Sequence, residues 1–183
     1  MISRHSRRGA TPVAAAAAAA LLAALAACAA PAAPTSFPAS GSGLAPTGPT
    51  QAATLVSVTD GDTIRVKIGG VEYRVRYTGI DTTEIGDTPE PFSLEARTAN
   101  SELLGEREII LEKDVSETDR FGRLLRYVWV RGDGGGWTLV NLELLRAGLA
   151  RVVTFPPDVK YHDSLFRPAE REAREAGLGI WEP

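Results

Sequence analysis

Residues 63–84 read TIRVKIGGVEYRVRYTGIDTTE. Apolar and polar residues alternate along Thr63–Ile68 and again along residues 71–78, which predicts two strands that each bury one face. Gly69-Gly70 between them is typical of a two-residue hairpin turn. After Ile80 the alternation stops, and an aspartate, two threonines and a glutamate follow. The stretch therefore predicts a β-hairpin whose second strand ends in an acidic turn.

Similar signals place further elements on both sides of this hairpin. Ser93 is the expected N-cap of a first helix, and Pro168 either lies in the first turn of the last helix or kinks it. The expected strands are residues 54–58, 63–68, 71–78, 108–113 and 124–130, with 150–155 extended; the expected helices are 93–105, 139–147 and 163–176. Five strands and three helices predict an α+β domain, mainly β, folded as a small, partly open barrel with helices packed on it.

The first 27 residues have the composition of a targeting segment. Basic residues near the start precede an apolar run over residues 13–27, which is too short for a membrane span. The run ends in Leu25-Ala26-Ala27-Cys28, which resembles the signal of bacterial lipoproteins, in which the cysteine is lipidated after cleavage. An ordinary secretory signal with an incidental cysteine is the alternative, and Ser6-Arg7-Arg8 leaves twin-arginine export open. We expect an extracytoplasmic protein of the bacterial cell envelope, anchored to the membrane through Cys28.

Residues 28–53 are expected to be a flexible tether, and residues 54–183 the folded domain. After the cysteine, the tether is made only of small or polar uncharged residues with many prolines and a few apolar ones, which cannot bury a core. Three of the 20 basic residues precede Cys28, so the remaining 17 face all 23 acidic residues, a formal charge of −6. A protein that coats polyanions should be basic, so this charge argues against that class while leaving room for a local basic cleft. The single cysteine excludes an intrachain disulfide.

Three short motifs carry the candidate chemistry. They are Asp60-Gly61-Asp62, Arg76 followed by Asp81 and Glu84, and Asp119-Arg-Phe-Gly-Arg123. Alone, the first is usually a hairpin turn, the second a solvated acidic turn, and the third a surface ion pair between Asp119 and Arg120. Together, clustered carboxylates beside guanidinium groups can hold a hard cation and a phosphate in one place.

With these three motifs in this order and at compatible spacing, the sequence resembles the thermonuclease family, the staphylococcal-nuclease-like domains. Gly148-Leu-Ala150 and Gly179-Ile-Trp181 fit as well, so the resemblance covers residues 54–182. It implies an OB-fold, a five-stranded barrel with three helices. It also implies calcium-dependent hydrolysis of phosphodiester bonds in DNA and RNA, with little sequence preference, by a protein expected to be a monomer.

The resemblance also implies roles for individual residues. Asp62, Asp81 and the Thr82 carbonyl would bind calcium, a hard cation that prefers oxygen ligands in loose geometry, with Asp60 close behind. Glu84 would act as general base or organise the attacking water. Arg76 and Arg123 would bind the scissile phosphate, since a guanidinium matches two phosphate oxygens at once.

The acidic turn departs from the family pattern. The family has Asp-Thr-Pro-Glu where this chain has Asp81-Thr-Thr-Glu84, and that tetrapeptide occurs six residues later, at 87–90. The family keeps an arginine five residues before the aspartate, and Arg76 stands in that relation to Asp81. We therefore assign the site to Asp81 and Glu84. Thr83 replaces the proline and frees the backbone before Glu84.

Other positions leave alternatives open. Phe121 and Phe155 stand where related chains have pocket tyrosines, so base affinity is in question. His162 is expected to be a helix cap or a surface residue. Two rival functions are a catalytically inactive OB-fold module that binds nucleic acid, and a structural envelope lipoprotein. Neither gives a reason for keeping all the acids and both arginines.

Overall fold

The computed structural model describes residues 43–132 and 134–183. The expected signal peptide, Cys28 and the tether up to residue 42 lie outside the described residues. No helix in the described part of the chain is long and apolar enough to cross a bilayer.

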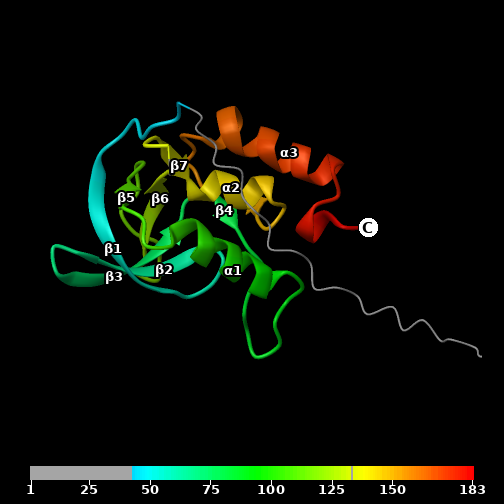
Figure 1. The fold of residues 1–183 in the computed structure, drawn as a ribbon, viewed down its shortest axis with the longest axis horizontal. Helices are drawn as coiled ribbons and strands as arrows, with labels where there is room; N and C mark the ends of the chain where they lie inside the picture. The colour runs from blue at the N-terminus through cyan, green and yellow to red at the C-terminus, as the bar shows by residue number, and fades with distance from the viewer. Residues whose placement is uncertain (1–42, 133) are drawn as a thin grey trace, which may run out of the picture. The chain divides into compact units, whose positions relative to one another are not determined.

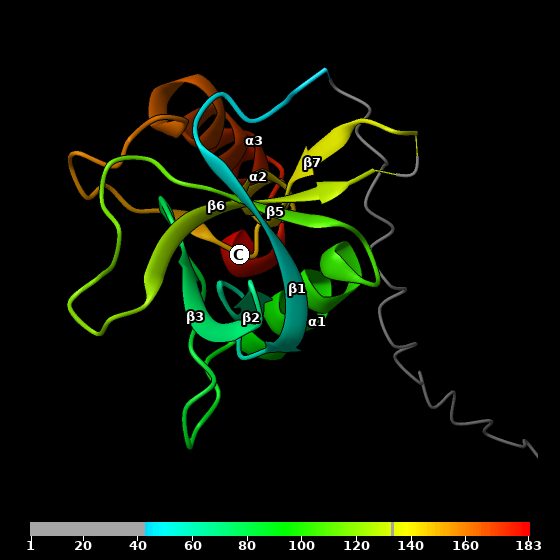
Figure 2. The ribbon, with the colours of Figure 1, turned by 90° about the vertical axis from the view of Figure 1, so that its left-hand side faces the viewer.

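Five strands close into a barrel (Figures 1 and 2). β1 (Thr50–Val58), β2 (Thr63–Ile68) and β3 (Val71–Tyr77) form an antiparallel meander. β1 also pairs with β5 (Ile109–Glu112), which pairs with β6 (Leu124–Arg131). A parallel pairing of β3 with β6 closes the ring. The five-stranded barrel with three helices is confirmed, and it is closed rather than partly open.

β1 is longer than expected and belongs to two sheets. Its first residues, Thr50–Ala53, pair with β5, and Thr54–Val58 pair with β2 across a register shift between Leu55 and Ser57. The strand therefore begins four residues before the expected start at Thr54. These residues are uncharged and carry no large apolar side chain, as a tether would, but their backbone groups pair with the edge of β5.

The hairpin of β2 and β3 has the expected turn and register. Gly69 and Gly70 have φ of 58° and 87°, the left-handed values that a tight hairpin turn requires. The inward residues Ile64, Val66 and Val75 are fully buried. Alternation therefore sends the polar residues between them, such as Arg65, Lys67 and Arg74, to the outer face of the barrel.

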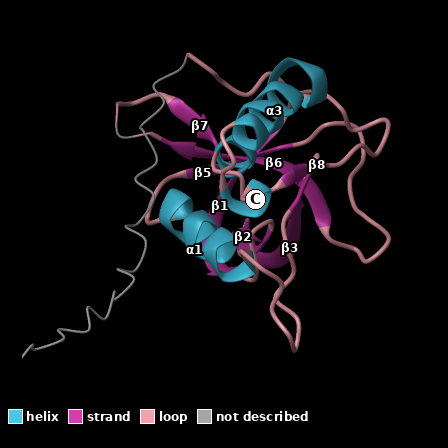
Figure 3. Cartoon of the chain, turned by 90° about the vertical axis from the view of Figure 1, so that its right-hand side faces the viewer, coloured by secondary structure: helices cyan, strands magenta, loops and turns pink. Residues whose placement is uncertain are grey.

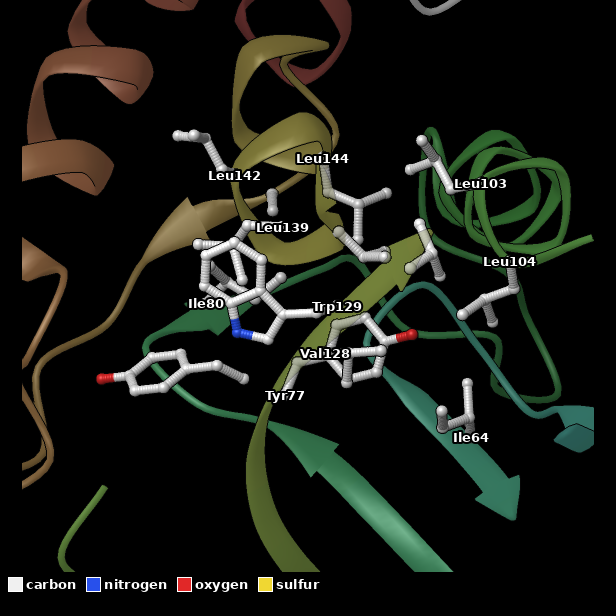
Figure 4. Close-up of a cluster of buried hydrophobic side chains, with 14 of the residues drawn as sticks. Ile64, Tyr77, Ile80, Leu103, Leu104, Val128, Trp129, Leu139, Leu142 and Leu144 are labelled. Carbon is white, nitrogen blue, oxygen red and sulfur yellow. The ribbon is translucent and has the colours of Figure 1, made fainter. Parts of the chain in front are cut away.

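Three α-helices pack on the barrel (Figure 3): α1 (Ser93–Leu104), α2 (Val140–Arg146) and α3 (Arg167–Glu175). Leucines of α1 and α2 meet strand residues such as Trp129 in the core (Figure 4). Ser93 is the first helical residue and not the cap. Phe92 precedes it with φ 65°, and the Ser93 hydroxyl donates to the Glu90 carbonyl at 2.7 Å.

Several short elements add to this framework. β8 (Arg151–Val152) lies within the stretch 150–155 that was expected to be extended, and it pairs with β4 (Ile80–Asp81). β4 was not expected as a separate strand, nor was β7 (Trp137–Leu139), which extends the sheet beyond β6. A π-helical segment, η1 (His162–Phe166), precedes α3, and a 3₁₀ turn, η2 (Gly179–Trp181), follows it.

Two open points about the last helix are also answered by these elements. Pro168 lies in the first turn of α3, so it does not kink the helix. His162 is buried, not a surface residue, and its Nε2 lies against the Thr154 hydroxyl.

Candidate active site

The turn at Asp60-Gly61-Asp62 is fixed against α1. The Asn100 amide donates to the Asp60 carbonyl at 3.1 Å, and the Tyr77 hydroxyl donates to the Asn100 side chain at 2.7 Å. A Cβ at Gly61 would lie 2.7 Å from atoms of both Ala96 and Thr82, so only glycine fits this approach. The turn is therefore held by the helix on one side and by the acidic turn on the other.

Asp62 is a buried carboxylate at the centre of the site. Its side chain is 2% exposed. One oxygen accepts from the Thr82 backbone N–H at 2.7 Å and from the Thr82 hydroxyl at 3.2 Å. The other accepts from the Thr63 hydroxyl at 3.2 Å and forms an ion pair with Arg76. These bonds fix the acidic turn after β4 onto the turn before β2.

Arg76 connects the two acids that were expected to bind calcium. One guanidinium nitrogen pairs with Asp62 and the other with Asp81. The Asp81 side chain is 49% exposed and the Arg76 side chain 14%, so the cluster runs from the interior to the surface. Arg76 pairs with Asp81 and not with Asp87. The nearby Glu90 side chain instead accepts from the Glu84 backbone N–H at 3.0 Å.

Arg123 reaches the same place from a loop between β5 and β6. Asp119 accepts from the Arg123 backbone at 2.9 Å and from its Nε at 2.7 Å. Burial alone would raise the pKa of Asp119, but hydrogen bonds from Arg123 and Phe121 hold it below its ordinary value. The expected ion pair of Asp119 with Arg120 was wrong. Gly122 has φ 73°, which turns the chain so that Arg123 faces Asp119. The glycine directly before Arg123 is the feature of the sequence that could have indicated this turn.

An open pocket of about 510 Å³ brings the two arginines together, whereas Asp62, Asp81 and Glu84 are not among the residues that line it. Arg76 lines it from β3 and Arg123 from the loop, with the exposed rings of Phe121 and Phe155 along its rim. The two phenylalanines are 59% and 69% exposed, so a flat group can reach the exposed part of each ring and stack on it.

Carboxylates outnumber cations in the acidic part of the site. Loss of water around Asp60 raises the pKa of its carboxyl, against the opposing pull of Thr63, Arg76 and Arg123. Partial loss of water, followed by the negative charge of Asp60, raises the pKa of Glu84. The charge of the cluster therefore acts on Glu84, although its carboxylate forms no hydrogen bond within the described part of the chain.

The donor set fits a hard cation. Asp62, Asp81 and the Thr82 carbonyl are oxygen ligands of the kind that calcium takes, and extra negative charge surrounds them. Within residues 43–132 and 134–183, no three histidine, cysteine, aspartate or glutamate side chains already converge as a metal site. Arg76 is the counter-charge of both carboxylates in this arrangement.

Comparisons with known proteins identify the family of this chain. Residues 74–183 match the family described as staphylococcal nuclease homologues. The thermonuclease of Staphylococcus intermedius is 38% identical over 128 residues, which cover 68% of this chain and 73% of that protein. The thermonuclease of Staphylococcus hyicus is 34% identical over 134 residues (72% and 76%). Endonuclease YncB of Bacillus subtilis is 39% identical over 133 residues (70% and 60%). The chain belongs to the staphylococcal nuclease homologue family.

Proposed function

We propose that this hydrolytic nuclease cleaves phosphodiester bonds in DNA and RNA with little sequence preference, and that it needs calcium. The observation that carries the proposal is the position of Arg76. It pairs with Asp62 and Asp81 and lines one pocket with Arg123. A phosphate in that pocket would lie between two guanidinium groups and beside a set of cation ligands.

Arg76 would exchange partners when substrate binds. Its guanidinium would leave the two carboxylates for the phosphate oxygens, and the freed oxygens of Asp62 and Asp81 would become cation ligands, with the Thr82 carbonyl beside them. A bound calcium ion would supply positive charge against the phosphate and help to orient the attacking water. Substrate and cation would therefore each improve the binding of the other.

Glu84 would take the proton of the attacking water. Its raised pKa supports this role, because a carboxylate that titrates closer to neutral pH is a stronger base than an ordinary one. Arg76 and Arg123 would stabilise the charge that grows on the phosphate in the transition state. Phe121 and Phe155 would hold a base next to the cleaved bond by stacking, which accepts any base and so gives little sequence preference.

A degradation assay tests the activity. The full-length protein is incubated with plasmid DNA, single-stranded DNA or RNA, in calcium or in chelator. We expect degradation of all three substrates in calcium and none in chelator. Tight binding without cleavage under all metal conditions would replace the enzyme with an inactive nucleic-acid-binding module.

Two matched variants test the site. Glu84→Gln should lower kcat by about 10²- to 10⁴-fold, the usual contribution of a general base. Asp87→Asn changes an exposed acid of the same loop and should leave kcat within about twofold of the parent. Equal losses in the two variants, or a loss only in Asp87→Asn, would refute the assignment of the base to Glu84.

We also propose that export leaves the enzyme outside the cytoplasm, held in the envelope by a lipid on Cys28. The cysteine stands at the end of the apolar run, and it is the only one in the chain. Mass spectrometry of the mature N-terminus checks this directly: an acylated Cys28 is expected. A soluble product cleaved elsewhere would point to ordinary secretion.

A further inference from the structure

The outer face of the β2–β3 hairpin carries basic side chains in line with Arg76. Cross-strand pairing puts Arg65 opposite Arg74 and Lys67 opposite Glu72, on the same outward face as Arg76. Arg65, Lys67 and Arg74 are all exposed. We call these three residues the hairpin track. The track leads from the candidate site towards the hairpin tip, which Figure 1 shows reaching out beyond the barrel.

The charge of the hairpin track is only partly compensated. Glu72 accepts from the Arg65 Nε at 2.6 Å, and it is the one acid in the two strands. Arg74 donates to a neutral group, the Phe121 carbonyl, at 3.1 Å. In the part of the chain that the structure describes, neither Lys67 nor Arg74 forms an ion pair with a carboxylate. Like charges directly opposite each other across two strands are unfavourable, and an anion lying over Arg65 and Arg74 would remove that cost.

The hairpin track joins the pocket without a break. The bond from Arg74 to the Phe121 carbonyl ties the track to the pocket loop. The guanidinium groups of Arg120 and Arg123 lie 4.7 and 5.6 Å from the centre of the Phe121 ring. Positive charge therefore continues from the pocket arginines, over the exposed ring, onto the hairpin.

The neighbouring strand leaves this surface open to an anion. β1 borders β2, and its residues opposite Lys67 and Arg65 are Thr54 and Ser57. Both are exposed hydroxyl residues, and β1 contains no acid. The described domain as a whole is acidic, so a basic face with hydroxyl donors beside it is a local feature.

We infer that the hairpin track binds the backbone phosphates of a single-stranded polynucleotide on one side of the bond that is cleaved. This inference rests on the proposed function, because it takes the bond to lie between Arg76 and Arg123. Positions of one strand face are about 6.8 Å apart, which a single strand can match by stretching from a stacked rise of about 3.4 Å per nucleotide. The track would make long substrates better than short ones without reading their sequence.

A triple variant, Arg65→Gln/Lys67→Gln/Arg74→Gln, tests the track in the full-length protein. The matched control, Arg167→Gln/Arg171→Gln/Arg174→Gln, removes the same charge from exposed positions of α3, away from the hairpin (Figure 1). Two quantities are measured: the Kd of a single-stranded 20-mer in chelator, over a range of salt, and kcat/KM in calcium for a 20-mer and a trinucleotide.

We expect the track variant to bind the 20-mer about 10- to 100-fold more weakly. Its log Kd should depend on log salt with a slope reduced by about 2, since each phosphate contact on a single strand contributes about 0.7. Its kcat/KM should fall on the 20-mer and stay within about twofold on the trinucleotide, which is too short to reach the track. The α3 control should match the parent protein.

The outcomes separate the two proposals. An unchanged Kd for the 20-mer in the track variant overturns the inference, whether or not the parent cleaves DNA. A parent that binds through the track but cleaves nothing contradicts the proposed function alone. Equal losses on the 20-mer and the trinucleotide would show that the triple substitution disturbs the pocket, and this too overturns the inference. Lost binding to phosphatidylglycerol vesicles, with an unchanged 20-mer Kd, would assign the track to a lipid surface instead.

Discussion

Two carboxylate clusters in the domain differ in how fully they are neutralised. Glu112 is completely buried, and five donors serve it: the backbone N–H groups of Thr47 and Gly48 at 3.0 and 2.7 Å, the Lys160 ammonium at 2.9 Å, and the Trp129 and Tyr161 side chains, both at 2.8 Å. Burial raises the pKa of Glu112, but these donors outweigh it, and the net shift is downward. In the active-site cluster the shifts of Asp60 and Glu84 are upward.

The difference separates a structural carboxylate from a functional one. Every oxygen of the Glu112 carboxylate is already in use, so a ligand could enter only by breaking bonds that hold the fold. In the active-site cluster, Arg76 is the direct ion-pair partner of both Asp62 and Asp81, and negative charge is left over. An excess of buried or half-buried negative charge is unfavourable unless a cation or a proton relieves it. That incomplete neutralisation is the reason for choosing the second cluster as the candidate site.

The largest effect is expected from Arg76→Lys. It keeps the positive charge beside Asp62 but loses the fork that binds two phosphate oxygens, so kcat/KM should fall about 10²- to 10³-fold. Thermal unfolding should change by only a few degrees, because a cation still faces the buried carboxylate. Steady-state kinetics on single-stranded DNA measure this. A fully active lysine variant would show that Arg76 serves only as a counter-charge, like Lys160 beside Glu112.

The second effect concerns stability. Glu112→Gln removes the charge that Lys160 needs and leaves donors without their acceptor, so it should lower the free energy of unfolding by about 3–5 kcal/mol. The control, Glu108→Gln, breaks a surface pair with Arg131 in which both side chains are about half exposed, and it should cost less than about 1 kcal/mol. Urea unfolding compares the two. The folded Glu112→Gln protein should keep its activity; a selective loss of activity would place Glu112 in the functional cluster.

The two clusters should respond to acid with opposite signs. The lowered pKa of Glu112 means that its stabilisation is complete above its unfolded value, 4.5, and is lost as pH falls through the folded value. The stability difference between the parent and Glu112→Gln should therefore shrink below pH 4.5. The raised pKa values of Asp60 and Glu84 favour the protonated folded form, so ionising these groups costs stability as pH rises.

Activity offers a second measure of that contrast. Because Glu84 must be ionised to accept a proton, the acid limb of the kcat/KM profile should lie above pH 4.5. A profile that stays flat down to pH 4.5 would be inconsistent with Glu84 as the base. Urea midpoints and initial rates, taken on the same buffers, give both halves of the comparison.

The smallest effect, on the free energy of unfolding, is expected from substitutions at the adjacent residues Thr82 and Thr83. Thr82 donates its hydroxyl to Asp62, whereas the buried Thr83 hydroxyl has no hydrogen-bond partner. Thr83→Val should therefore raise the free energy of unfolding by about 1 kcal/mol, and Thr82→Val should lower it by a similar amount. Chemical unfolding of both variants tests this. Equal destabilisation by the two changes would mean that the Thr83 hydroxyl contributes a bond in solution.

The alternation of residues 63–78 was enough to predict the hairpin, because a period of two is visible in a single sequence. That Arg76, Asp62 and Asp81 would meet was implied by the resemblance to the thermonuclease family, and the three side chains do meet in the structure. The start of β1 was missed because backbone pairing, rather than any side-chain pattern, makes residues 50–53 a strand. The two-residue strands β4 and β8 are too short for periodicity to appear.

The Glu112 cluster could not have been predicted by this route. Its donors come from positions as distant in sequence as Thr47 and Tyr161, and the sequence of β5 gives no indication of which residues will donate to Glu112. The role of Asp119 was missed for a different reason: adjacent opposite charges suggested a pair with Arg120, while the turn at Gly122 returns the chain so that Arg123 meets the carboxylate. Packing and turn geometry, not composition, decided both.

The parallel pairing of β3 with β6 has a consequence for how activity appears during folding. Arg76 belongs to β3, and Arg123 stands directly before β6, so the two arginines proposed to bind phosphate meet only when the β3–β6 pairing forms. Contacts between segments so distant in sequence carry a large loop-closure cost and tend to form late. A fragment that lacks the β3–β6 pairing would not bring Arg76 and Arg123 together. The rate at which cleavage activity recovers after dilution from denaturant would therefore report the rate at which the barrel closes.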